Sequence, residues 1–130
     1  YLPIPAGVEG MNLSHCVLGE PGPEPEAAFL QGMGATAIFE DDHEWRALRD
    51  KQYTYAIYRS DGSERLFDNL ADPYQMNDLV GDPTHDERLN RFRALLQQRM
   101  AALNDTFESC TWYRDNWTQD RLILRTATTP

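Results

Sequence analysis

The chain has 130 residues, 41% of them hydrophobic, with 12 basic and 21 acidic side chains and a formal net charge of −9. This length allows one domain with a modest core, and the acidic balance argues against nucleic acid as a partner because phosphate backbones are repelled. No run approaches the roughly 20 apolar residues of a membrane span, and no targeting segment is recognisable. We therefore expect a soluble piece of a longer protein.

Residues 1–26 are rich in proline and glycine, which confines regular structure there to short pieces. The one promising element covers residues 11–18, where three apolar side chains lie close together. Cys16 falls inside it, and the only other cysteine is Cys110. Two thiols do not make a disulfide framework, so the sequence leaves their pairing open.

A short apolar run at residues 27–32, bounded by Pro25 and Gly32, predicts a first strand. The acidic triplet Glu40-Asp41-Asp42 follows it. Carboxylate oxygens suit hard cations, but these three are not spaced as in a calcium loop. A solvated turn is the favoured interpretation.

Three further strands are predicted at residues 45–49, 52–59 and 64–68. In the middle one, Tyr53, Tyr55 and Ile57 alternate with polar or small residues and would share one face. Asp61-Gly62 supplies residues that tolerate the positive φ of hairpin turns. We therefore expect an antiparallel meander.

A long helix is predicted over residues 84–103. Its start has two candidate signals: Thr84 with Glu87 as a capping box, or Asp82 as N-cap with Pro83 at the first helical position. Apolar residues recur at spacings of three and four and form one stripe that should cover one face of the sheet: Leu89, Phe92, Leu96, Met100 and Leu103.

The ordered string from Trp45 to Leu79 resembles the C-terminal subdomain of type I, formylglycine-dependent sulfatases of the alkaline phosphatase-like superfamily. The string comprises a strand with Arg46, a tyrosine-rich strand, the strand around Leu66-Phe67-Asp68, and the turn Asp72-Pro73-Tyr74 before Asn77-Asp78-Leu79. The segment Gly10-Met11-Asn12-Leu13-Ser14 is similar to the bridge that closes the catalytic domain in that family.

The resemblance implies an α+β fold, with a small four-stranded antiparallel sheet and one long helix packed across one of its faces. Residues 1–26 would form an irregular bridge from an absent catalytic domain, and residues 27–105 the subdomain itself. Residues 106–130, with Trp112, Tyr113 and Trp117, would form a tail. Because aromatic residues are too many there for simple disorder, we expect the tail to pack on the subdomain or on a partner.

The resemblance to sulfatases implies that the rim of the substrate cleft is faced by His43, Trp45 and Arg46. An arginine fork can hold a sulfate ester through charge-assisted hydrogen bonds, and an aromatic ring can stack on a sugar or aryl group. The alternative is structural: Trp45 lies in the core, Arg46 pairs with a carboxylate, and His43 is a loop residue.

The chain has no catalytic machinery of its own in this interpretation. Neither Cys16 nor Cys110 begins the C/S-x-P-x-R motif from which formylglycine is made. The parent enzyme would supply formylglycine and a divalent cation, with calcium as the expected ion, from its N-terminal catalytic domain. That domain, or a second copy of the chain, would be the partner. The alternative function is an independent α+β module for protein interaction or self-association.

Overall fold

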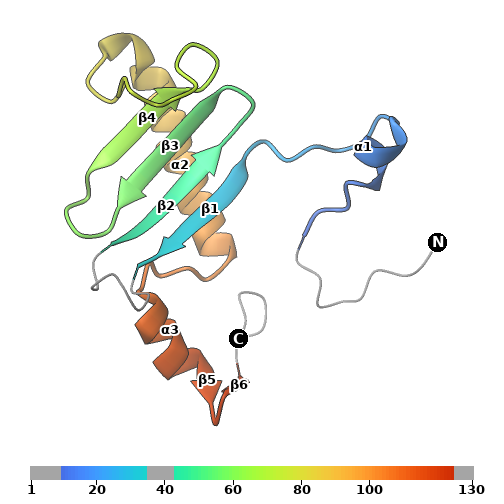
Figure 1. The fold of residues 1–130 in the computed structure, drawn as a ribbon, viewed down its shortest axis with the longest axis vertical. Coiled ribbons are helices and arrows are strands. Elements are labelled where there is room, and N and C mark those ends of the chain that lie inside the picture. Colours follow the sequence, from blue (N-terminus) through green and yellow to red (C-terminus); the bar gives the residue numbers. More distant parts are fainter. Residues whose placement is uncertain (1–9, 35–42, 125–130) are drawn as a thin grey trace.

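The computed structural model describes residues 10–34 and 43–124 (Figure 1). The acidic triplet at residues 40–42 lies outside the described residues. In chain order the elements are α1 (Ser14–Leu18), β1 (Ala28–Met33), β2 (Glu44–Arg49), β3 (Tyr53–Tyr58), β4 (Glu64–Asp68), η1 (Pro83–His85), α2 (Asp86–Ala102), α3 (Cys110–Trp117), β5 (Thr118–Gln119) and β6 (Leu122–Ile123).

The four longer strands form one antiparallel sheet in the order β1-β2-β3-β4, which confirms the predicted meander and α+β class. Between β3 and β4 the chain turns at Gly62, whose φ of 67° lies in the left-handed region that glycine adopts without strain. The register places Tyr55 between Leu48 of β2 and Leu66 of β4. These three side chains therefore point to the same face.

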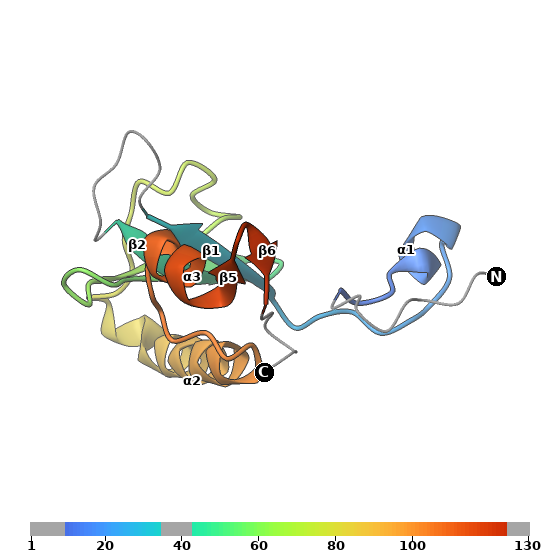
Figure 2. The same ribbon diagram turned by 90° about the horizontal axis from the view of Figure 1, so that it is seen from below.

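Helix α2 lies along that face, on the underside of the sheet in Figure 2. Its apolar stripe meets the sheet through Leu89, Phe92 and Leu96, each at most 4% exposed, and the rings of Phe92 and Tyr55 stack with centroids 6.0 Å apart. Met100 packs at the edge of this core. Burial of each such side chain contributes about 1.5–3 kcal/mol, more than helical propensity alone supplies.

The start of the helical region resolves the two candidate caps. Asp82 accepts a hydrogen bond from the backbone N–H of Thr84 (2.9 Å), and Pro83 stands in the first turn of η1. His85, the residue before α2, makes no capping hydrogen bond with its side chain. The Asp82-Pro83 alternative is therefore the one realised, and the Thr84-Glu87 capping box is not.

The face of the sheet opposite α2, called the open face below, carries Leu30 of β1, Trp45 and Ala47 of β2, and Ala56 and Tyr58 of β3. Leu30 is 38% exposed and Tyr58 is 36% exposed, whereas Ala47 is buried. No helix covers this face in the part of the chain that the structure describes (Figure 2). Within residues 10–34 and 43–124 it is consequently a partly apolar surface that no second helix or sheet layer covers.

The two ends of the chain contribute little to the core. Helix α1 buries none of its residues and stands apart from the sheet in both views, and α3 with the small β5-β6 hairpin continues beyond one end of the strands (Figures 1 and 2). Cys16 and Cys110 are not joined by a disulfide. Among the described residues, no helix is both long enough and apolar enough to span a membrane.

Candidate functional site

Trp45 lies on the open face, in register with Gly32 on one side and Tyr58 on the other. A Cβ placed on Gly32 would come within 2.1 Å of Trp45 Nε1, so the indole lies directly across the glycine. The glycine is needed because any larger residue would displace the ring. Trp45 is half-buried, which leaves part of its surface open to a ligand or to another protein surface.

Arg46, the next residue of β2, points to the other face and is completely buried. Its Nε and Nη2 atoms donate to the two carboxylate oxygens of Asp105, at 2.5 and 3.0 Å. Nη1 donates to the carbonyl oxygens of Gly32 (3.2 Å) and Trp45 (3.1 Å), and Nη2 donates also to that of Glu108 (3.4 Å). All five N–H groups of the guanidinium therefore have acceptors within the chain.

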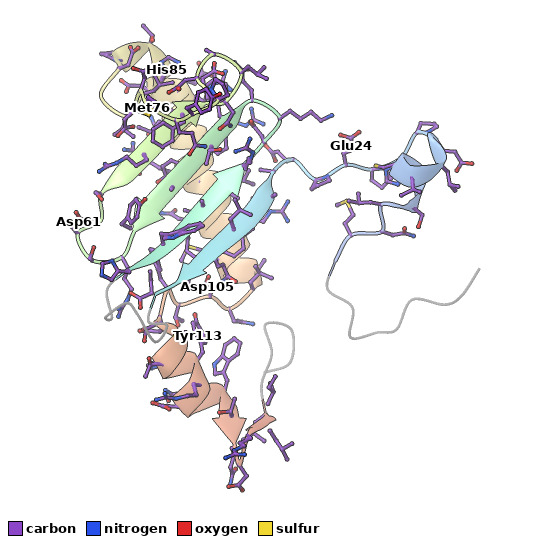
Figure 3. The ribbon with its side chains drawn as sticks, in the orientation of Figure 1. Glu24, Asp61, Met76, His85, Asp105 and Tyr113 are labelled. Atoms are coloured by element: carbon purple, nitrogen blue, oxygen red, sulfur yellow. The ribbon has the colours of Figure 1, made fainter. Side chains whose placement is uncertain are left out.

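Asp105 joins four parts of the structure. Besides Arg46, it accepts hydrogen bonds from Gln31 Nε2 of β1 (2.7 Å), the backbone N–H of Phe107 (2.8 Å) and the hydroxyl of Tyr113 in α3 (2.9 Å). Burial alone would raise the pKa of Asp105, but the hydrogen bonds from Arg46, Phe107 and Gln31 outweigh it and hold the pKa below the ordinary value. Figure 3 shows Asp105 and Tyr113 together where α3 leaves the sheet.

Phe107 completes this arrangement. Its ring lies 4.8 Å from the guanidinium carbon of Arg46, in the geometry of a cation–π contact. Its backbone has a φ of 62°, a region that costs a residue with a side chain some free energy. The surrounding contacts with Arg46 and Asp105 hold it there.

A second charged group lies at the start of β2. Glu44 is completely buried, and neither of its carboxylate oxygens has a hydrogen-bond partner. The nearest cation is Arg59, whose Nη1 lies 3.6 Å from Glu44 Oε2 and whose Nη2 donates to Glu108 Oε2 at 3.2 Å. Neighbouring His43 is exposed. A carboxylate buried this way is costly unless the ion pair compensates for the lost water.

The three residues predicted from the sequence are thus divided by the sheet. His43 is exposed before β2 and Trp45 lies on the open face, while Arg46 lies on the α2 face, where its carboxylate partner matches the structural alternative. Their role in substrate binding stays a prediction. Sequence reasoning missed Asp105 and Glu44, since no local pattern links Arg46 to a carboxylate 59 residues later.

No metal centre emerges from the described residues, where no three histidine, cysteine, aspartate or glutamate side chains are grouped to hold an ion. A hollow of about 600 Å³ lies at the opposite end of β2, away from the Arg46–Asp105 pair. Acidic and basic side chains line it together, including Glu24, Arg49, Asp50 and Lys51. Since Glu24 already pairs with Lys51 at 2.6 Å, this hollow offers no concentrated charge to a ligand.

Comparison with known proteins relates the chain to sulfatases. No family model matches the chain. The ulvan-active sulfatase of Formosa agariphila is 39% identical to it over 113 residues, which is 85% of the chain and 21% of the relative. The chain thus spans about a fifth of the length of the curated relative that it matches.

Several solved structures share the fold, of which two are described here. One is a 2-O GAG sulfatase, with a TM-score of 0.68 and 23% identity over 90% of this chain and 26% of its own. The other was solved with its substrate D-glucosamine-2-N,6-O-disulfate and has a TM-score of 0.67 and 17% identity, covering 93% of this chain and 23% of its own. The sequence match and the shared α+β fold together identify the chain as a C-terminal subdomain of the sulfatase family.

Proposed function

We propose that the chain is the accessory end of a sulfuric ester hydrolase, inactive alone, which completes the enzyme's fold and one rim of its substrate cleft. The observation that carries this proposal is the 39% identity to a sulfatase whose length the chain covers by only 21%. The C/S-x-P-x-R motif is not among these 130 residues. We place formylglycine and a divalent cation, calcium in our proposal, in an N-terminal catalytic domain of the same polypeptide.

The partner in this proposal is that catalytic domain, and the open face is the surface that meets it. Leu30 and Tyr58 are more than a third exposed there, and Trp45 lies between their strands. An apolar sheet face is stabilised when another layer covers it. Self-association through the same face is the competing outcome, and the oligomeric state of the isolated chain distinguishes the two.

The domain boundaries follow from the same idea. We propose residues 1–26 as the bridge, residues 27–105 as the subdomain, and residues 106–130 as a tail that packs on the subdomain or its partner. The 90% and 93% of the chain that two solved relatives cover support the inclusion of parts of the bridge and of the tail in one unit with the subdomain.

For the substrate we propose a sulfate ester of ulvan, because the 39% identical relative is an ulvan-active sulfatase. Trp45 and His43 would contact it at the rim, with the indole against a sugar ring. Arg46 would act from behind the sheet: its Nη1 bonds to the carbonyl oxygens of Trp45 and Gly32 fix the backbone on which the indole lies. In this proposal the arginine positions the contact surface, and the sulfate group is held by the catalytic domain.

The test is to extend the reading frame upstream and assay the whole polypeptide. We expect a C/S-x-P-x-R motif a few hundred residues earlier, and sulfate release from ulvan or a generic aryl sulfate. Removal of the cation with a chelator should abolish the activity, and the isolated chain should show none. Turnover by the isolated chain, or a start codon directly before Tyr1, would refute the proposal.

A further inference from the structure

The turn at residues 69–77, after β4, exposes three large apolar side chains within seven residues. Leu70 is 71% exposed, Tyr74 is 86% exposed and Met76 is 79% exposed. Single exposed apolar residues are ordinary on protein surfaces, but a cluster of them marks an interaction site. We call this cluster the apolar turn.

The backbone of the apolar turn is held in one conformation by its own carboxylates. Asp68 Oδ1 accepts from the N–H groups of Leu70 (2.9 Å) and Ala71 (3.1 Å). Asp72 Oδ2 accepts from the N–H of Asn77 (2.7 Å), and the Asp72 carbonyl accepts from the N–H of Gln75 (3.0 Å). A surface fixed in this way loses little conformational entropy when a partner binds.

The apolar turn is also tied to the sheet. Gln75 Nε2 donates to Asn69 Oδ1 (2.9 Å), while the backbone N–H and the Nδ2 of Asn69 both donate to the Gln52 carbonyl, at 2.7 and 2.9 Å. In Figure 2 the yellow-green turn rises on the side of the sheet opposite α2. The apolar turn therefore continues the open face rather than forming a separate surface.

We infer that the apolar turn anchors this subdomain to the catalytic domain of the same polypeptide, by inserting Leu70, Tyr74 and Met76 into an apolar concavity. The inference rests on the proposed function, and it adds a defined contact to it. Three observations support the catalytic domain as the partner. The turn continues the face proposed to meet that domain, and the chain covers only 21% of its curated relative. In addition, Asp68 and Asp72 are engaged in holding the backbone of the turn.

The position of the bridge agrees with this occupant. Glu24 of the bridge pairs with Lys51 at 2.6 Å, and the next residue, Gln52, carries the carbonyl that holds Asn69. The bridge and the apolar turn thus meet the sheet at the same β2–β3 loop. Figure 3 shows Met76 at one end of the sheet and Asp105 at the other, so this anchor lies away from the Arg46–Asp105 pair.

The test compares Met76 oxidation by dilute hydrogen peroxide, followed by mass spectrometry, in the isolated chain and in the full-length polypeptide. We expect sulfoxide to form several-fold more slowly in the full-length protein, because the thioether is then covered. In parallel, a double variant that combines Tyr74→Ser with Met76→Ser should lower the thermal unfolding midpoint of the full-length protein. The same double substitution in the isolated chain is the control and should leave its midpoint unchanged, because the side chains already contact water.

The outcomes separate this inference from the proposed function. An active full-length sulfatase in which Met76 reacts as fast as in the isolated chain would overturn the anchor and leave the function intact. Protection of Met76 in the isolated chain that increases with protein concentration would assign the turn to a second copy and also overturn the anchor. A full-length protein without sulfatase activity would overturn the function and, with it, the catalytic domain as the occupant.

Discussion

The guanidinium of Arg46 and the carboxylate of Asp105 form a buried two-point pair, with Nε–Oδ2 and Nη2–Oδ1 distances of 2.5 and 3.0 Å, that fastens β2 to the segment after α2. Their side chains are 0% and 3% exposed. Neither group can exchange its partner for water, so the loss of one leaves the other charge uncompensated.

Replacement of Asp105 by alanine should therefore destabilise the chain by about 3–5 kcal/mol, the usual cost of leaving one member of a buried pair without its partner. Urea unfolding of the isolated chain measures it. The control is Glu26→Ala, which removes the partner of Arg91 in an exposed pair (2.6 Å) and should change stability far less, because water screens that pair. Similar losses in the two variants would contradict a special role for Asp105.

Replacement of Gly32 by alanine should displace Trp45, because the new Cβ would fall 2.1 Å from its Nε1. Overpacking of this kind costs about 1–3 kcal/mol. The changed surroundings of the indole should also shift the emission of Trp45, which is obtained by subtracting the spectrum of a Trp45→Phe variant. Gly10→Ala is the matched control, since a Cβ there meets nothing within 4 Å. An unchanged spectrum and unchanged stability would show that the indole is free to move aside.

Acid should destabilise the chain partly through Glu64. Its pKa lies below the ordinary 4.5, first because Arg93 donates hydrogen bonds to it, Nε at 2.8 Å, and also because Tyr55 donates its hydroxyl. The unfolded chain takes up the proton at higher pH than the folded one, so this contribution is present above pH 4.5 and is lost as the pH falls through the folded pKa. The free energy of unfolding, measured between pH 6 and 3, should therefore depend less steeply on pH in Glu64→Gln than in the wild type. Glu24→Gln should change this slope much less, because water screens the exposed pair that Glu24 forms with Lys51.

The first turn of the helical region depends on Asp82. Removal of its side chain by Asp82→Ala should lower the thermal unfolding midpoint, because the backbone N–H of Thr84 then loses its acceptor. Thr84→Ala should lower it less, because the Thr84 hydroxyl donates to Asp82 (2.7 Å) and caps no backbone N–H itself. Thermal unfolding followed by circular dichroism compares the two. A larger loss for Thr84→Ala would favour the capping box instead.

The sheet and its helix could be predicted from the sequence because their signals are local. Alternation identified the faces of β3, the glycine at position 62 identified a turn, and apolar residues three and four apart identified the buried side of α2. The predicted bounds of these elements differ from the observed ones by at most three residues, and those of β4 coincide. Ends are set by hydrogen bonds such as that of Asp82, for which the sequence offered two equivalent solutions.

The candidate site was less accessible to such reasoning. Trp45 and Arg46 are neighbours in sequence, yet the pleat sends them to opposite faces of the sheet, and only the register shows which face α2 covers. Asp105 carries no local mark of its long-range role. Helix α3 was missed as well, although Ser109, whose side chain accepts from the N–H of Trp112, is a typical helix-capping residue.

The Arg46–Asp105 pair also sets an order of events during synthesis. The two residues lie 59 positions apart, so at a translation rate of about 5–20 residues per second the arginine waits roughly 3–12 s for its carboxylate to be made. Until then the β2 strand of the ribosome-bound chain carries Arg46 without the carboxylate that lets its guanidinium be buried. Final closure of the subdomain is therefore delayed until the chain has been translated through Asp105, whereas the β2–β3 and β3–β4 hairpins can pair before that point.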